Sequence, residues 1–140
     1  MPRYYYHIVA LVALVATGCS TIDTRPPEEI VEERALAQAQ ALVNQDYEAA
    51  LSYVTPSYQE GPRADFYAAN HSGSAFWKRT EVRWVRCDND PEVERCSVRI
   101  WVYGTIPSSG RVTSDRGDTV PASLDSVWIK IEGQWYQYLE

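Results

Sequence analysis

The residue types best suited to covalent chemistry in this chain are its three cysteines. Cys19 follows a short apolar run near the amino terminus, whereas Cys87 and Cys96 stand in the second half and flank eight residues. A thiolate is a nucleophile, and two neighbouring thiols can be oxidised to a disulfide. The two settings therefore predict different chemistry, with a single reactive thiol at Cys19 and a pair at Cys87 and Cys96.

The segment before Cys19 has the features of a targeting sequence. Arg3 and the amino terminus are positive, and residues 8–16 ("IVALVALVA") form an unbroken apolar run. A membrane-spanning helix needs about 20 apolar residues, so this shorter run is typical of the apolar core of a signal peptide. Small residues at 16–18 lead into Cys19. This pattern resembles the lipobox of bacterial lipoproteins, although Ala16 stands where the lipobox usually has leucine.

The resemblance to bacterial lipoproteins implies a location and an organisation of the chain. Residues 1–18 would be the signal peptide, residues 19–26 the lipidated N-terminus and tether, and residues 27–140 a single domain. Acyl chains on Cys19 would hold the protein to the membrane, and Ser20 implies the outer membrane, facing the periplasm. The tether, residues 20–26, reaches at most roughly 25 Å when extended, so the domain would stay close to the bilayer. The alternative is an ordinary secretory signal with an incidental cysteine.

Cys87 and Cys96 are predicted to form a disulfide. The cell envelope outside the cytoplasm is oxidising, and these two cysteines remain once Cys19 is lipidated. They lie at facing ends of a predicted hairpin around "DNDPEVER". A metal site is the alternative, but no histidine or further cysteine lies nearby in the sequence.

The remaining polar residues show no catalytic pattern. His71 is the only histidine after residue 18, and it lies in a polar segment, so we expect a solvated loop residue. Paired carboxylates, a phosphate-binding glycine loop and a metal-ligand cluster are missing from the sequence. We therefore expect no catalytic residue, no metal and no cofactor. The formal net charge of −6 also argues against nucleic-acid binding, which requires cationic surface.

The first half of the domain has helical periodicity. Residues 27–45 begin with Pro27, carry glutamates in the first turns and place an apolar stripe at helical spacing. Asp46 is suited to cap a second helix over 47–54, and a third short helix is predicted over 63–70, burying Phe66. Residues 70–74 are predicted to form a loop. The first two helices could also be half of a tetratricopeptide repeat, but no second copy is present.

The second half has the two-residue periodicity of strands. We predict strands over 80–88, 95–106, 122–131 and 134–139, with a tight turn at Glu132 and Gly133 and a long loop over 107–118. Helices followed by a long antiparallel sheet make an α+β domain. All five tryptophans lie at or beyond Trp77, in this strand half.

The predicted disulfide also sets a register for the first two strands. With Cys87 opposite Cys96, Val85 faces Val98 and Trp84 faces Arg99. Further along the strands, Arg83 faces Ile100 and Val82 faces Trp101. One face then carries Val85, Val98, Ile100 and Val102, which resembles a core. The other face is mixed and could be an interaction face: it carries Val82, Trp84, Arg99, Trp101 and Tyr103, with Arg86 nearby. A β-bulge would shift these pairs.

Two stretches, "ALVNQDYEAALSYV" and "SVWIKIEGQWYQYL", resemble the nuclear transport factor two-like (cystatin-like) superfamily. This resemblance implies a cone in which a curved antiparallel sheet of about four strands wraps around two or three N-terminal helices, often with a pocket inside. The superfamily includes isomerases, dehydratases, ligand-binding modules and assembly domains, so the fold does not select a function.

Three functional classes therefore remain. We expect a non-catalytic envelope lipoprotein that presents its aromatic face to a second copy or to another envelope protein. The alternative is a cone pocket for an apolar or amphipathic small molecule. An isomerase-like or dehydratase-like enzyme is the third class. Tryptophan and tyrosine suit either kind of binding, because each combines a large apolar area with a polar group, and the same residues can also simply fill the core.

Overall fold

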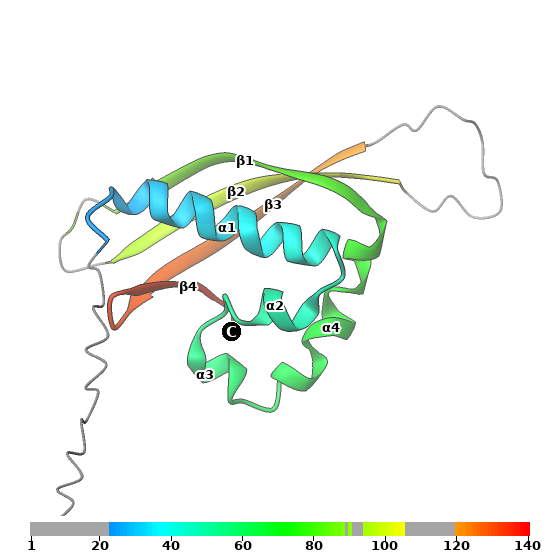
Figure 1. Ribbon diagram of the computed structural model, residues 1–140, viewed down its shortest axis with the longest axis horizontal. Coiled ribbons are helices and arrows are strands. Elements are labelled where there is room, and N and C mark those ends of the chain that lie inside the picture. The colour runs from blue at the N-terminus through cyan, green and yellow to red at the C-terminus, as the bar shows by residue number, and fades with distance from the viewer. Residues whose placement is uncertain (1–22, 89, 91–93, 106–119) are drawn as a thin grey trace, which may run out of the picture.

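The computed structural model describes residues 23–88, 90, 94–105 and 120–140, which form helices packed on one four-stranded sheet (Figure 1). This is the predicted α+β class, with the helices first and the strands second. The elements are α1 (Pro27–Val43), α2 (Tyr47–Leu51), α3 (Pro56–Gln59), η1 (Ala64–Phe66), α4 (Tyr67–Asn70), η2 (Ser72–Phe76), β1 (Trp77–Cys87), β2 (Arg95–Gly104), β3 (Val120–Ile131) and β4 (Gln134–Tyr138). The two η elements are 3-10 helices.

The first two helices form as the sequence predicts. Pro27 occupies the first turn of α1, where no intrahelical N–H bond is lost, and acidic residues follow it. The Asp46 carboxylate caps α2 by accepting a hydrogen bond from the Ala49 backbone N–H at 3.0 Å. Helix α2 ends at Leu51, earlier than predicted.

The third predicted helix is divided into η1 and α4, and this corrects the expected burial. Phe66 is 62% exposed, whereas Tyr67 is 1% exposed and takes the buried place expected for Phe66. A 3-10 turn has fewer residues per turn than an α-helix, so the change from η1 to α4 alters which residue faces inward. Residues 70–74 do not form the predicted loop, because α4 ends at Asn70 and η2 begins at Ser72.

The sheet is antiparallel with the strand order β1-β2-β3-β4. Glu132 and Gly133 connect β3 to β4 and have φ values of 50° and 83°. Positive φ at both central residues matches the twist of a two-residue hairpin, so the predicted turn is confirmed. Strand β4 pairs with β3 only from Val127 to Ile131, which leaves the earlier part of β3 as a free edge.

The predicted register of β1 and β2 holds near the cysteines and fails beyond them. Cys87 pairs with Cys96, Val85 with Val98 and Trp84 with Arg99. A β-bulge between Val82 and Trp84 then shifts the register, so Val82 lies opposite Ile100. The predicted pairs of Arg83 with Ile100 and of Val82 with Trp101 are therefore wrong.

The core lies between α1 and one face of the sheet, as Figure 1 shows by the course of α1 along the strands. On β2, alternate residues are buried and the residues between them are half-exposed. We call the buried side the inner face and the other side the outer face. The inner face supplies the predicted core residues Val98, Ile100 and Val102, and also contains Cys96, Trp128 and Trp135.

Candidate functional site

A cavity of about 370 Å³ lies between α1, the η2 turn and the inner face of the sheet. This volume is within the range of small-molecule binding sites. Its walls combine apolar and polar side chains. The lining residues are Gln38, Ala39, Leu42, Asn70, His71, Gly73, Ser74, Trp77, Ile100, Val102, Leu124, Asp125, Ser126 and Gln137.

The cavity exists because β4 is shorter than β3. Strand β4 leaves β3 after the pair formed by Tyr138 and Val127, so Leu124, Asp125 and Ser126 form a wall without a neighbouring strand on that side. The departing end of β4 is held instead by the α2–α3 connection, where Val54 and Gln137 form a parallel bridge.

Gln38 and Gln137 form a fixed polar pair in the cavity wall. Gln38 is 4% exposed, and its Nε2 donates to Gln137 Oε1 at 2.6 Å and to the Ala50 carbonyl at 3.3 Å. The Gln137 backbone N–H donates to the Tyr53 carbonyl at 2.8 Å. The amide groups are therefore oriented by contacts on α2 and on the α2–α3 connection.

His71 is part of the cavity wall, which corrects the expectation of a solvated loop residue. It is half-buried, and its ring centroid lies 4.0 Å from that of Tyr67. His71 Nδ1 is 2.8 Å from the Tyr67 carbonyl oxygen. Because that oxygen only accepts, Nδ1 must carry a hydrogen, and in the neutral ring Nε2 is then the acceptor. Tyr67 is itself buried, and this burial raises its pKa to about 12.

One buried hydroxyl group in this wall, Ser74 Oγ, has no hydrogen-bond partner among the described residues. Ser74 is 1% exposed and lines the cavity. Buried polar groups are normally satisfied, and an unsatisfied one in a cavity wall is available to a bound molecule. Sequence reasoning missed Gln38 and Ser74, because neither belongs to a recognisable motif.

Asp125 connects the cavity to the outer face of the sheet. Arg99 holds its carboxylate through two parallel hydrogen bonds, from Nε to Oδ1 and from Nη2 to Oδ2, each 2.7 Å long. These bonds from the Arg99 guanidinium hold the pKa of Asp125 below its ordinary value. The only carboxylate among the described residues lining the cavity is therefore ionised and already paired.

The outer face brings together four of the five residues predicted for it, each aromatic ring being covered by a guanidinium group. The guanidinium carbon of Arg79 lies 3.4 Å from the Tyr103 ring centroid, and that of Arg83 lies 4.1 Å from Trp101. Trp84 is covered by two arginines, Arg86 at 4.7 Å and Arg99 at 5.0 Å.

Val82 does not belong to this outer face. The bulge between Val82 and Trp84 places it opposite Ile100, and its side chain packs against the inner core. Val82 and Val85 therefore face the same side although they are three residues apart. In a regular strand, two residues three apart would point to opposite faces. The spacing of these two valines was therefore the one signal in the sequence that could have revealed the bulge.

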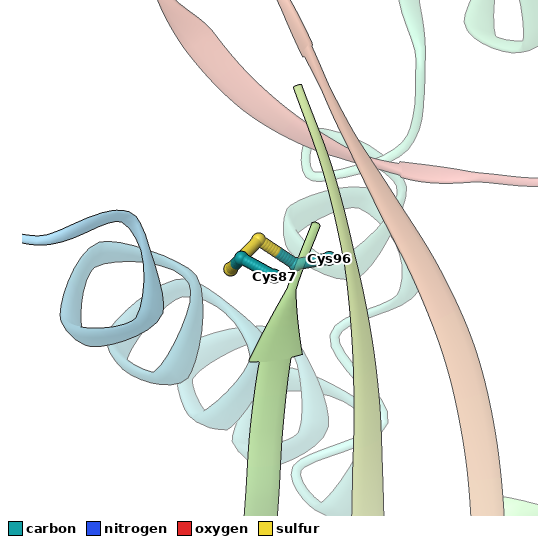
Figure 2. Close-up of a disulfide and its surroundings, with 2 residues drawn as sticks. All are labelled: Cys87 and Cys96. Carbon is teal, nitrogen blue, oxygen red and sulfur yellow. A yellow bond between two sulfur atoms is a disulfide. The ribbon is translucent and has the colours of Figure 1, made fainter. Parts of the chain in front are cut away.

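The predicted cysteine pair lies on the inner face. The Cys87 and Cys96 sulfur atoms are bonded at 1.96 Å, and Figure 2 shows the disulfide on the side of the sheet near α1. Cys96 is fully buried in the core cluster that includes Val31. Cys19 lies outside the described residues, so its predicted lipidation stays a prediction.

The part of the chain that the structure describes contains neither a metal site nor a helix that could cross a membrane. No group of three or more histidine, cysteine or acidic side chains is placed to hold a metal ion. No helix there is both long and apolar enough to cross a membrane.

Comparison with solved structures identifies the fold. No protein-family model matches the sequence, and no curated protein is significantly similar to it. A protein from Campylobacter jejuni named as an NTF2-like transpeptidase is 15% identical, with a TM-score of 0.57 over 79% of this chain and 98% of that one.

Two bacterial proteins that contain a SEC-C motif are also similar. The one from Rhodopseudomonas palustris is 14% identical, with a TM-score of 0.55 over 83% of this chain and 80% of that one. The one from Psychrobacter arcticus is 15% identical, with a TM-score of 0.55 over 79% of this chain and 59% of that one. At these identities the likeness concerns the fold alone, and it agrees with the helices-then-sheet architecture. The described part of this chain therefore has a cone-like α+β fold similar to that of the Campylobacter jejuni protein.

Proposed function

We propose that this protein is a non-catalytic binding protein whose cavity between α1 and the sheet takes a small amphipathic molecule. The observation that carries this proposal is the cavity of about 370 Å³, whose lining combines apolar and polar side chains. Trp77, Ile100 and Val102 offer apolar contact, while Gln38 and the unpartnered Ser74 hydroxyl offer hydrogen bonds. A mostly apolar pocket with a few oriented polar groups is the usual form of a small-molecule site.

The polar groups of the cavity suit binding better than proton transfer. An efficient general base has a pKa near the working pH, whereas Arg99 lowers the pKa of Asp125. The amides of Gln38 and Gln137 are bonded to each other and do not exchange protons near neutral pH. These contacts support a site that positions a ligand without transforming it.

The location that we propose for this function is the bacterial cell envelope. The resemblance of residues 16–19 to a lipobox supports lipid attachment at Cys19. The short tether would then hold the cavity close to the membrane surface, from which an amphipathic molecule could be taken up. The Cys87–Cys96 disulfide agrees with an oxidising compartment.

A second candidate function is supported by the outer face. Trp84, Trp101 and Tyr103 are half-buried there, although no described helix packs on that side of β2. Aromatic and arginine side chains are enriched at protein–protein interfaces. The outer face would then contact another envelope component while the cavity binds its ligand.

Dye binding by the anchored protein tests the cavity. The full chain in phosphatidylcholine nanodiscs is titrated with the neutral amphipathic dye prodan, and empty nanodiscs provide the background. Gly73 lines the cavity, and a Cβ atom added there meets nothing within 4 Å, so Gly73→Phe fills space without a backbone clash. We expect saturable dye fluorescence that Gly73→Phe reduces at least about tenfold in affinity, equivalent to the loss of about 1.4 kcal/mol.

The matched control is Ala75→Phe. Ala75 is an exposed residue of the same η2 turn and does not line the cavity, so this variant should bind prodan as the unmodified protein does. Equal binding by Gly73→Phe and Ala75→Phe would contradict the proposed site.

A further inference from the structure

A row of arginines runs along the outer face of β1 and β2. The cavity involves this row only through the ion pair of Arg99 with Asp125. We propose that this row binds an extended acidic segment of a partner protein. The inference rests on the second candidate function, that the outer face is an interface. The groove at one end of the row shares Asp125, Ser126 and Gln137 with the cavity, so both kinds of binding are measured on the same variants.

The outer face has the opposite charge to the chain as a whole. Among the described residues, β1, β2 and β3 place five arginines and two carboxylates on this face, and Glu140 adds a third carboxylate in the groove beside Arg95. The face therefore keeps an excess of positive charge, whereas the full chain has a formal net charge of −6. Opposite charge across an interface steers and orients a partner, so this local excess favours an acidic one. The outer-face charges are Arg79, Arg83, Arg86, Arg95, Arg99, Glu81 and Asp125.

The spacing of the row matches an extended chain. Arg99, Trp101 and Tyr103 are alternate residues of β2, so the arginine–aromatic units beside them repeat about every 6.8 Å. Alternate side chains of an extended peptide have the same repeat. A row of this kind can bind acidic side chains at every second position of a strand-like segment, which a small anion cannot exploit.

The outer face already shows how its arginines bind carboxylates. Asp125 is held by Arg99 in the two-bond geometry described above. Glu81 accepts hydrogen bonds from Arg83 at 2.7 Å and from the Tyr103 hydroxyl at 3.2 Å.

Two arginines at one end of the row remain available. Within the described residues no carboxylate pairs with Arg86 or Arg95. Arg95 lies with Trp84, Ser97 and Tyr138 around a groove of about 500 Å³, whose lining also contains Asp125 and Glu140. Asp125 is already paired with Arg99, so Arg95 is the unpaired cation of this groove.

The charge argues against a second copy of this chain as the partner. A two-fold symmetric contact places the same patch on both subunits, so the excess positive charge would face itself. A flat lipid surface also fits less well, because a groove follows a chain better than a plane.

The test uses fluorescence anisotropy with a labelled ten-residue peptide of alternating Glu and Thr. The full chain is held in nanodiscs of uncharged phosphatidylcholine. We expect saturable binding that weakens as salt screens the charges, and no binding of the matching Gln–Thr peptide. Arg86→Gln should weaken binding by about twofold to fivefold, as expected for one exposed ion pair, and Arg86→Gln with Arg95→Gln should weaken it further.

Arg63→Gln is the matched control, because it removes one exposed positive charge from the helical side of the protein. It should leave peptide binding unchanged. Equal effects of Arg63→Gln and Arg86→Gln would overturn the inference, as would equal binding of both peptides.

Two further outcomes would identify a different partner. Binding to phosphatidylglycerol vesicles without binding to the acidic peptide would replace the partner protein with a lipid surface. Self-association that Trp101→Glu abolishes would replace it with a second copy. Prodan binding is measured on the same variants, so failure at the outer face is distinguishable from failure at the cavity.

Discussion

The surroundings of Ser74 suit the binding of a ligand but lower the stability of the unliganded fold. Its hydroxyl is buried, yet it has no hydrogen-bond partner among the described residues. An unsatisfied buried hydroxyl costs roughly 1–3 kcal/mol, so this residue weakens the unliganded fold. Residues that bind ligands often carry such a cost, because the ligand supplies the missing partner.

We therefore expect Ser74→Ala to stabilise the unliganded protein. The free energy of unfolding, measured by denaturant titration, should rise by about 1 kcal/mol because the unsatisfied group is removed. Ser72→Ala is the control, since Ser72 is an exposed residue of the same η2 turn. A clear loss of stability in Ser74→Ala alone would mean that the hydroxyl is satisfied within the protein.

Tyr67 gives a pH dependence of stability at the alkaline end. Burial raises its pKa from 10.0 to about 12, so the neutral phenol is favoured in the folded state. The stabilising effect is present below pH 10 and is lost as the pH rises through about 12, because the unfolded chain ionises first. The free energy of unfolding should fall over this range, and Tyr67→Phe should fall less. Parallel curves for the two proteins would contradict the assigned burial.

The strands β1 and β2 show how far the sequence specifies an element. The cysteine pair predicted the correct register for four successive pairs, from Cys87 and Cys96 to Trp84 and Arg99. Beyond them the bulge moved Val82 to the inner face, because Val82 and Val85 both gain more by packing on the core than by keeping strict alternation. A two-residue periodicity assumes a regular strand, so it could not predict which face the residues beyond the bulge would take.

The helices, too, could be predicted only in part from the sequence. α1 and the Asp46 cap of α2 were predictable, because they depend on residues within one or two turns. The division into η1, α4 and η2 was not, because it depends on packing against α1 and the sheet. Gln38, His71 and Ser74 come together only through that packing, so the cavity could not be located in the sequence.

The disulfide should stabilise the β1–β2 hairpin. It closes a loop with a sequence separation of nine, and constraint of the unfolded chain by such a loop is worth about 2–3 kcal/mol. We expect Cys87→Ala with Cys96→Ala to lower the free energy of unfolding by about that amount or more, since Cys96 also packs in the core. Reduction of the unmodified protein should give a similar loss. No change on reduction would show that the two thiols are not paired in the native protein.

At the scale of the whole molecule, charge is distributed less evenly than its total suggests. The acidic N-terminal part of α1 and the arginine row of the outer face lie on different elements of one small domain. Net charge alone therefore gave no sign of the cationic face. The cavity, the outer face and the N-terminal segment can each be tested with their own variants, although the cavity and the outer face are joined through Asp125.

The N-terminal segment is tested by Cys19. Intact mass of membrane-extracted protein should show a chain that begins at Cys19 and carries acyl groups. Cys19→Ala should leave the membrane fraction, because it lacks the thiol that would carry the acyl chains. A processed Cys19→Ala protein that still fractionates with membranes would contradict lipid attachment.

The five tryptophans provide the most direct test of the cavity, because they report on different regions of the same molecule. Trp77 lines the cavity, Trp84 and Trp101 lie on the outer face, and Trp128 and Trp135 are in the core. Each indole N–H gives its own signal in a proton–nitrogen correlation spectrum of the full chain in nanodiscs. On addition of prodan, the cavity account predicts that the Trp77 signal moves furthest and that Gly73→Phe abolishes the movement. Movement of the Trp84 and Trp101 signals with Trp77 unchanged would place the ligand on the outer face and contradict the account.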